Sequence, residues 1–181
     1  MLFAQHNILS GLFLALALQL GAHGAAWSKD VFPMHQGLHE WPVASGKVMA
    51  IVGTYHDTTT FRRSYNFYFK TRDQDQWNQV PLVRTSDDVD FSPESAGAGD
   101  NTIADGIVVT QGANIYFVFA DKRPGKGATA VTWYKFIESD NAHPDDPGYY
   151  FKPVFTRSYA KNSKQTIDEV LTKESTLKPA K

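Results

Sequence analysis

Two histidines near the start of the chain have a spacing that zinc sites use. His35 and His39 are four residues apart, so on a helix both imidazoles would lie on one face, where zinc binds. His56 and Asp57 would supply further ligands if the fold brought them close. Gly37 and the prolines around it argue against that helix. We therefore interpret these histidines as surface side chains or as side chains packed on aromatic rings.

A second candidate for metal chemistry is the acidic segment between Asp87 and Asp105. It is rich in Asp, Gly, Ser and Ala and is the longest stretch that we expect to lack regular structure. Carboxylate oxygens suit a hard cation such as calcium, although the spacing is not that of an EF-hand. Two interpretations stay open, a solvated loop and a loop ordered by a cation. Its acidic residues are Asp87, Asp88, Asp90, Glu94, Asp100 and Asp105.

Two short motifs imitate those of serine hydrolases. Ser158-Tyr159-Ala160-Lys161 matches S-x-x-K and Ser139-Asp140-Asn141 matches S-D-N, two of the three motifs of serine β-lactamases. They occur in the reverse order along the chain, and the third motif, K-T-G, does not occur. The chain also has no G-x-S-x-G and no H-E-x-x-H motif. We therefore predict that the protein is not an enzyme and that it needs no cofactor, the structural cation aside.

A basic turn is the best candidate for contact with a partner. Lys122-Arg123-Pro124-Gly125-Lys126 lies between two predicted strands, and its charges would suit an acidic cleft. Lys122, Arg123 and Lys126 are the predicted partner-binding residues. Elsewhere Lys and Arg are scattered among acids and the net charge is −1, which argues against nucleic acid as the partner.

These residues must be positioned by strands. Alternating or β-branched apolar runs, separated by turn residues, predict seven strands, and no long helix interrupts them. They cover 47–55, 65–69, 77–83, 107–110, 114–119, 130–137 and 149–155. Such a pattern favours antiparallel pairing, with a two-sheet β-sandwich as the first choice and a barrel as the second. A short C-terminal helix, capped by Asn162 or Ser163, should cover an open end of the sandwich with Ile167, Val170 and Leu171.

The first residues have the character of a signal peptide. No Asp, Glu, Lys or Arg occurs before Lys29, and an apolar run over 8–20 is followed by small residues. This pattern predicts a leader over residues 1–24, with cleavage after Gly24 or Ala26, and export to the periplasm. Residues 25–181 should then form one β-sandwich domain that is not embedded in the membrane. The chain has no cysteine, so its core must be stable without disulfides.

Several segments between Lys47 and Val170 resemble the carbapenem intrinsic-resistance proteins, the CarG-like family. The resemblance rests on the run 63–70, on Gln79-Val80-Pro81, on 99–110, on 115–122 and on Gly148-Tyr149-Tyr150-Phe151. It implies a periplasmic protein that protects a carbapenem-producing bacterium, with a β-sandwich, short terminal helices and no known hydrolytic site.

The resemblance also implies a homodimer and, in some members, a bound cation, for which Asp100 and Asp105 are the candidate ligands. We therefore expect a non-enzymatic protection protein whose partner is a small-molecule antibiotic or another protein. The family's fold is shared with a periplasmic inhibitor of invertebrate-type lysozyme. The alternative is accordingly a lysozyme inhibitor that inserts its basic loop into the enzyme's cleft.

Overall fold

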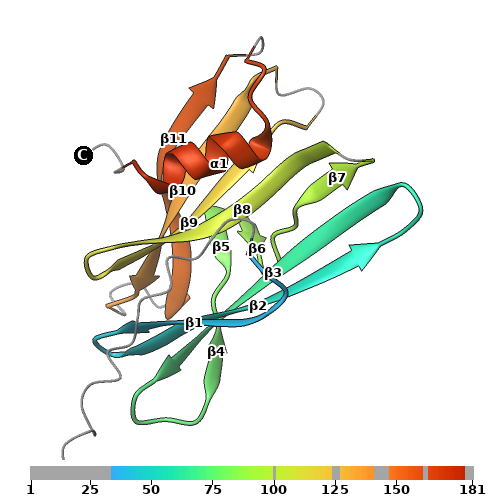
Figure 1. Ribbon diagram of the computed structural model, residues 1–181. Helices are drawn as coiled ribbons and strands as arrows, with labels where there is room; N and C mark the ends of the chain where they lie inside the picture. Colours follow the sequence, from blue (N-terminus) through green and yellow to red (C-terminus); the bar gives the residue numbers. More distant parts are fainter. Residues whose placement is uncertain (1–33, 100, 124–126, 141–146, 161–162, 178–181) are drawn as a thin grey trace, which may run out of the picture.

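The computed structural model describes residues 34–99, 101–123, 127–140, 147–160 and 163–177. Within them the chain is mainly β, with one short helix near the C-terminus, as the sequence predicts (Figure 1). The strands are β1 (Gly37–Val43), β2 (Gly46–His56), β3 (Thr60–Thr71), β4 (Trp77–Gln79), β5 (Leu82–Thr85), β6 (Asp88–Asp90), β7 (Ala96–Ala98), β8 (Asn101–Gln111), β9 (Asn114–Asp121), β10 (Thr129–Glu138) and β11 (Tyr149–Tyr159). The helix is α1 (Ile167–Ser175).

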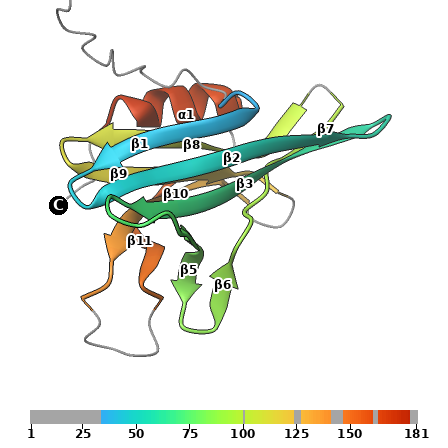
Figure 2. The same ribbon diagram turned by 90° about the horizontal axis from the view of Figure 1, so that it is seen from below.

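All these strands belong to one hydrogen-bonded sheet. Its order is β1-β2-β3-β7-β8-β9-β10-β11-β5-β6, and β4 pairs with β3 beside this path. Neighbours are antiparallel, as predicted, except for the single parallel bridge that joins β11 to β5 at Phe151 and Leu82. The β3–β7 pairing is only two residues long. The sheet therefore divides into a half around β1–β3 and a half around β8–β11 (Figures 1 and 2).

The two halves pack face to face, so one folded sheet produces the layered arrangement that was expected from two. Phe67 of β3 contacts Phe117 of β9 and Phe151 of β11, with ring centroids 4.9 and 4.8 Å apart. β3 and β11 are far apart in the sheet order, so these rings meet across the interior. The largest fully buried side chains of this core are Phe and Tyr rings.

Helix α1 covers the opposite face of the second half. Ile167, Val170 and Leu171 are buried against a second apolar cluster, which the outward-facing residues of β8–β11 form (Figure 1). The helix therefore covers a face of the sheet and not an open end. Its N-cap is Thr166, not Asn162 or Ser163, and the Thr166 and Glu169 side chains form a reciprocal capping box. Asn162 lies outside the described residues.

The segment around Gly37 and Pro42, where the prolines argue against a helix, forms β1, and Pro42 is accommodated because β1 is an edge strand. Two other expectations need correction. The predicted strand over 77–83 is two strands, β4 and β5, which are divided at Val80 and Pro81. The segment 87–105, expected to be irregular, contains β6, β7 and the start of β8.

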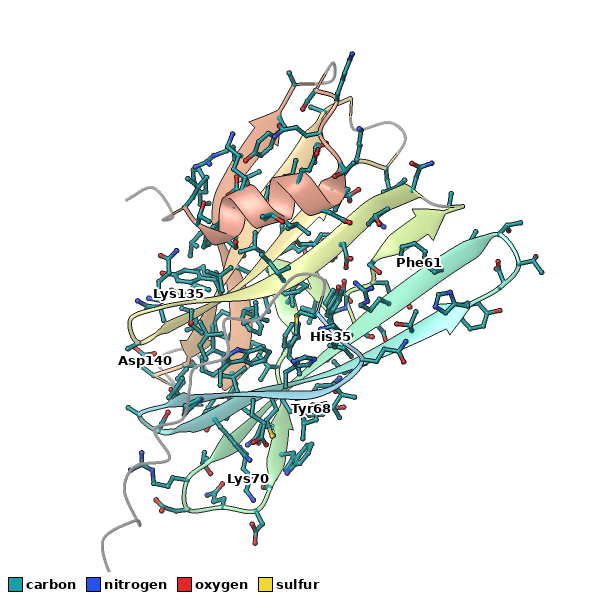
Figure 3. The ribbon with its side chains drawn as sticks, in the orientation of Figure 1. His35, Phe61, Tyr68, Lys70, Lys135 and Asp140 are labelled. Carbon is teal, nitrogen blue, oxygen red and sulfur yellow. The ribbon has the colours of Figure 1, made fainter. Side chains whose placement is uncertain are left out.

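The ends of β3 show how the halves connect. Phe61 lies beside β7, where the two halves join, and Lys70 lies at the far end of the strand (Figure 3). The predicted leader over 1–24 lies outside the described residues. Among the residues that are described, no helix has the length and apolarity to cross a bilayer.

Candidate functional site

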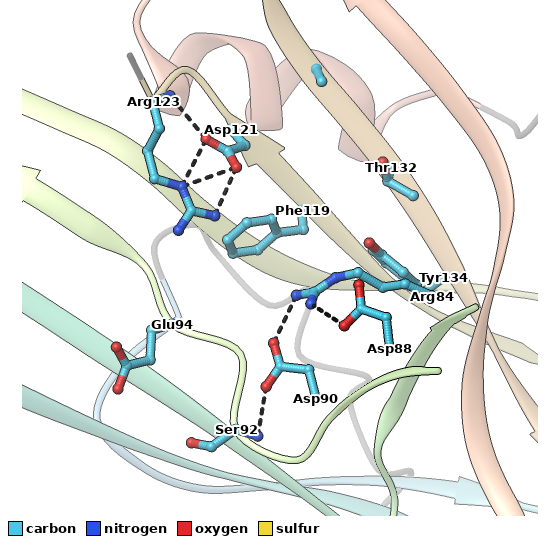
Figure 4. A pocket seen from close by; sticks show the side chains of 11 residues that line it. Arg84, Asp88, Asp90, Ser92, Glu94, Phe119, Asp121, Arg123, Thr132 and Tyr134 are labelled. Carbon is cyan, nitrogen blue, oxygen red and sulfur yellow. Dashed lines mark hydrogen bonds and ion pairs between the residues drawn. The ribbon is translucent and has the colours of Figure 1, made fainter. Parts of the chain in front are cut away.

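A polar hollow of about 500 Å³ lies between the β5–β6 hairpin, the segment over 91–95 and the strands β9 and β10 (Figure 4). Six of its eleven lining residues are charged. Its lining residues are Arg84, Asp88, Asp90, Ser92, Glu94, Phe119, Asp121, Arg123, Ala130, Thr132 and Tyr134. The volume falls within the range of small-molecule sites, roughly 300–1,000 Å³.

The β5–β6 hairpin supplies the first arginine of the hollow. The register shifts between Val83 and Thr85, at an irregularity that contains Arg84. The guanidinium of Arg84 donates to Asp90 at 2.7 Å and to Asp88 at 3.2 Å (Figure 4). Burial works against its charge, but hydrogen bonds with Tyr134 and Asp90 outweigh it and raise the pKa of Arg84. This arginine is therefore held in place by its own hairpin and by β10.

The end of β9 supplies the second arginine. Asp121, which is 4% exposed, accepts from Nε and Nη2 of Arg123 and from its backbone N–H, all within 3.0 Å. These bonds raise the pKa of Arg123, and burial opposes them. Arg84 and Asp90 are near enough to act on the same guanidinium electrostatically. The two arginines thus face one cavity, and carboxylates fix both of them.

The remaining walls combine aromatic and polar groups. Phe119 and Tyr134 are buried side chains that expose part of their surface to the hollow. Glu94 lines its other side, and also a neighbouring shallow hollow over the outer face of β2 and β3. Its carboxylate lies 3.7 Å from the guanidinium of Arg62, a distance typical of a weak, exposed ion pair. Such a site can hold a polar ligand by charge and by an aromatic surface together.

The basic turn lies only partly within the described residues. Lys122 is exposed, and Arg123 bends back onto Asp121 at the hollow. Lys126 lies outside the described residues. Partner binding through these three residues stays a prediction. Its contact with Asp121 nevertheless places the Arg123 side chain in the wall of the hollow.

The candidate cation ligand Asp105 lies in a buried ion pair. It is 2% exposed and accepts from Nη1 of Arg63 at 2.7 Å, from the hydroxyl of Tyr65 and from the backbone N–H of Gly106. Burial raises the pKa of Asp105, and Arg63 and the hydrogen bonds oppose that rise. Asp100 lies outside the described residues. A cation bound by this pair stays a prediction, and protein donors already occupy both carboxylate oxygens of Asp105.

The described histidines are not arranged as metal ligands. His39 Nε2 is 2.7 Å from the carbonyl oxygen of His35, and its ring stacks on Trp41. This agrees with the interpretation of His39 as a side chain packed on an aromatic ring. Within the described ranges, no group of three His, Asp or Glu side chains is placed to hold a metal ion.

Sequence reasoning named Asp88, Asp90, Glu94 and Arg123, but it did not bring them together and it missed Arg84 and Asp121. Arg84 and Asp121 come from strands about 40 residues apart in the chain, and each looks like an ordinary surface charge in the sequence. The available signal was local, because Asp121 stands two residues before Arg123 at a strand end. A charge pair at that spacing favours an arginine side chain that folds back onto the aspartate, rather than one that extends outward.

Comparison with known proteins supports the fold alone. No protein-family model matches the chain, and no curated protein matches it in sequence. Among solved structures, the crystal structure of CarG superposes with a TM-score of 0.61 at 15% sequence identity. The match covers 80% of this chain and 93% of that one. This chain therefore has a CarG-like fold.

Proposed function

We propose that this chain is an exported, non-enzymatic protection protein of the carbapenem-resistance type, acting in the periplasm. The observation that carries the proposal is the CarG-like fold, which extends over nearly the whole length of the CarG structure. The segments that resemble the CarG-like family give independent support, because they were identified from residues alone. Protection would come from holding the antibiotic or a partner, and not from cleaving a bond.

The ionisable groups of the interior are consistent with a binding role. Asp105 pairs with Arg63, and Glu174 pairs with Arg157. Each carboxylate also accepts from a tyrosine hydroxyl. Groups tied to permanent partners in this way stabilise the fold and do not offer a free base. No observation favours the lysozyme-inhibitor alternative, since Arg123 turns toward the hollow.

The experiment is a resistance measurement in a carbapenem-sensitive host. Cells would express the full chain, a variant without residues 1–24, or an empty vector. The full chain should raise the minimum inhibitory concentration of a carbapenem, and the leaderless variant should not, because it would stay in the cytoplasm. Unchanged resistance with the full chain, when the protein is detected in the periplasm, would overturn the proposal.

A further inference from the structure

The charges around the hollow restrict what it can bind. Four carboxylates and two guanidinium groups line it, so an apolar ligand would leave them desolvated and a simple anion would meet excess negative charge. The carboxylates are Asp88, Asp90, Glu94 and Asp121, and the guanidinium groups are Arg84 and Arg123. A ligand with charges of both signs satisfies this lining better than an apolar ligand or a simple anion does.

Arg123 offers the donor for the negative end of such a ligand. Asp121 occupies Nε and Nη2, while Nη1 donates no hydrogen bond within the described residues. Because Asp121 is buried and holds the guanidinium in a fork, Nη1 is fixed before any ligand arrives. A guanidinium edge fixed in this way is well suited to a carboxylate and costs little entropy on binding.

Glu94 offers the acceptor for the positive end. Within the described residues its carboxylate makes one ion pair, the 3.7 Å contact with Arg62, and its side chain is half-exposed. Asp88 lies on the opposite side of the hollow, beside Arg84, so it does not share the same cationic group (Figure 4). Phe119 and Tyr134 add aromatic surface that an organic cation or a compact ring can contact.

We infer that the hollow binds a small zwitterion, with its carboxylate on Arg123 and its cationic nitrogen beside Glu94 (Figure 4). This inference rests on the proposed function, and it names the ligand class for that role: a carbapenem that carries an amine. The aromatic walls would contact the fused rings of the antibiotic.

The test compares two probes by isothermal titration calorimetry. The first is thienamycin, a carbapenem with a carboxylate and a primary amine, and the second is its N-acetyl derivative, which lacks the cation. Thienamycin should bind about three- to tenfold more tightly, the range of one charge-assisted contact at a half-exposed site. The variant Glu94→Gln should abolish that difference. Equal binding of the two probes to the wild type, or binding of neither, would overturn the inference.

Variants at Arg123 test the other end of the ligand. Arg123→Gln should weaken both probes by about tenfold. Because this change also leaves Asp121 buried without its partner, Arg123→Lys provides a second variant, which keeps the charge but loses the fork. Arg123→Lys should weaken both probes less than Arg123→Gln, and unchanged binding in both variants would contradict the role of Arg123. Glu40→Gln, an exposed charge outside the hollow, is the matched control and should bind like the wild type.

Resistance measurements on the same variants separate the two proposals. If the wild type protects cells but does not prefer thienamycin over its N-acetyl derivative, the zwitterion inference is wrong and the protective role stands. If the wild type does not protect, the proposed function fails whatever the calorimetry shows. If protection and the preference for the amine are both lost in Glu94→Gln, both proposals are supported.

Discussion

Replacing Glu174 by leucine should strongly destabilise the protein, because this carboxylate joins helix α1 to the sheet. Its side chain is fully buried and accepts from Trp133 Nε1 at 2.8 Å, from the hydroxyl of Tyr159 at 2.5 Å and from Arg157 at 3.1 Å. Leucine has a similar volume but no acceptor. Trp133 and Tyr159 would then keep buried donors with no partner, whereas Arg157 is 32% exposed and can turn to water.

The size of the effect follows from those two donors. An unsatisfied buried polar group costs about 1–3 kcal/mol, so two of them give about 2–6 kcal/mol. Water can reach part of Tyr159, which is 8% exposed, so we expect a loss of about 3 kcal/mol in the free energy of unfolding. For a chain of this length that corresponds to a fall in Tm of about 6–12 °C.

Urea denaturation followed by tryptophan fluorescence measures this loss. Asp75→Asn is the control, since its carboxylate is fully exposed and its loss should leave the free energy of unfolding nearly unchanged. A double-mutant cycle with Tyr159→Phe adds a sharper test. Removing the hydroxyl should cost stability in the wild type but not beside Glu174→Leu, giving a coupling of at least about 1 kcal/mol. A loss below 0.5 kcal/mol in Glu174→Leu, or a coupling of zero, would refute the reasoning.

Three further predictions concern strand β2, the N-cap of helix α1 and the turn before β3. Gly46→Ala should cost about 1–3 kcal/mol in urea denaturation, since its Cβ would lie 2.1 Å from the backbone oxygen of Lys70, whereas Gly53→Ala in the same strand has room and should be nearly neutral. Thr166→Ala removes the N-cap of α1 and should cost about 0.5–2 kcal/mol by the same measurement. Hydrogen bonds from the backbone of Thr59 and from Thr60 lower the pKa of Asp57 to about 2, below its ordinary 3.8. The ionised carboxylate therefore stabilises the fold above pH 3.8, and the stability difference between the wild type and Asp57→Asn should shrink as the pH falls from 3.8 through 2.

The long strands could be predicted because their side chains alternate. Tyr65, Phe67 and Phe69 point to the interior from β3, and all three are fully buried. Such a period of two indicates a strand whatever its neighbours are. The gap between the strands predicted over 107–110 and 114–119 is likewise a turn, at Gly112 and Ala113, and Gln111 pairs with Asn114 across it.

The short strands could not be predicted because their neighbours create them. β6 and β7 are three residues each, too short to show a period. β7 forms because Gly97 lets the ring of Phe61 pack where a Cβ would otherwise stand. That contact joins residues 36 positions apart, so no local pattern reveals it. β1 was hidden by Pro42, which is harmful inside a sheet but tolerated at an edge.

The hollow depended on the same long-range information. Its two arginines come from β5 and from the end of β9, which are separated in the sheet order by β10 and β11. In the sequence their charges are scattered among others of both signs and look solvated. Arg123 was identified as part of a basic turn, but its contact with Asp121 depends on where β9 ends. Residue types alone therefore named Arg123 but not the carboxylate that holds it, and its binding of a partner stays a prediction.

The most direct test of the central claim, that this protein binds and does not cleave, is the fate of the antibiotic. A large excess of thienamycin would be incubated with the purified wild type, and opening of the β-lactam ring would be followed by ultraviolet absorbance. We predict that ring opening proceeds at the rate of a matched solution without protein. Steady loss of many equivalents of thienamycin per protein, with the loss proportional to protein concentration, would show an enzyme and contradict the account.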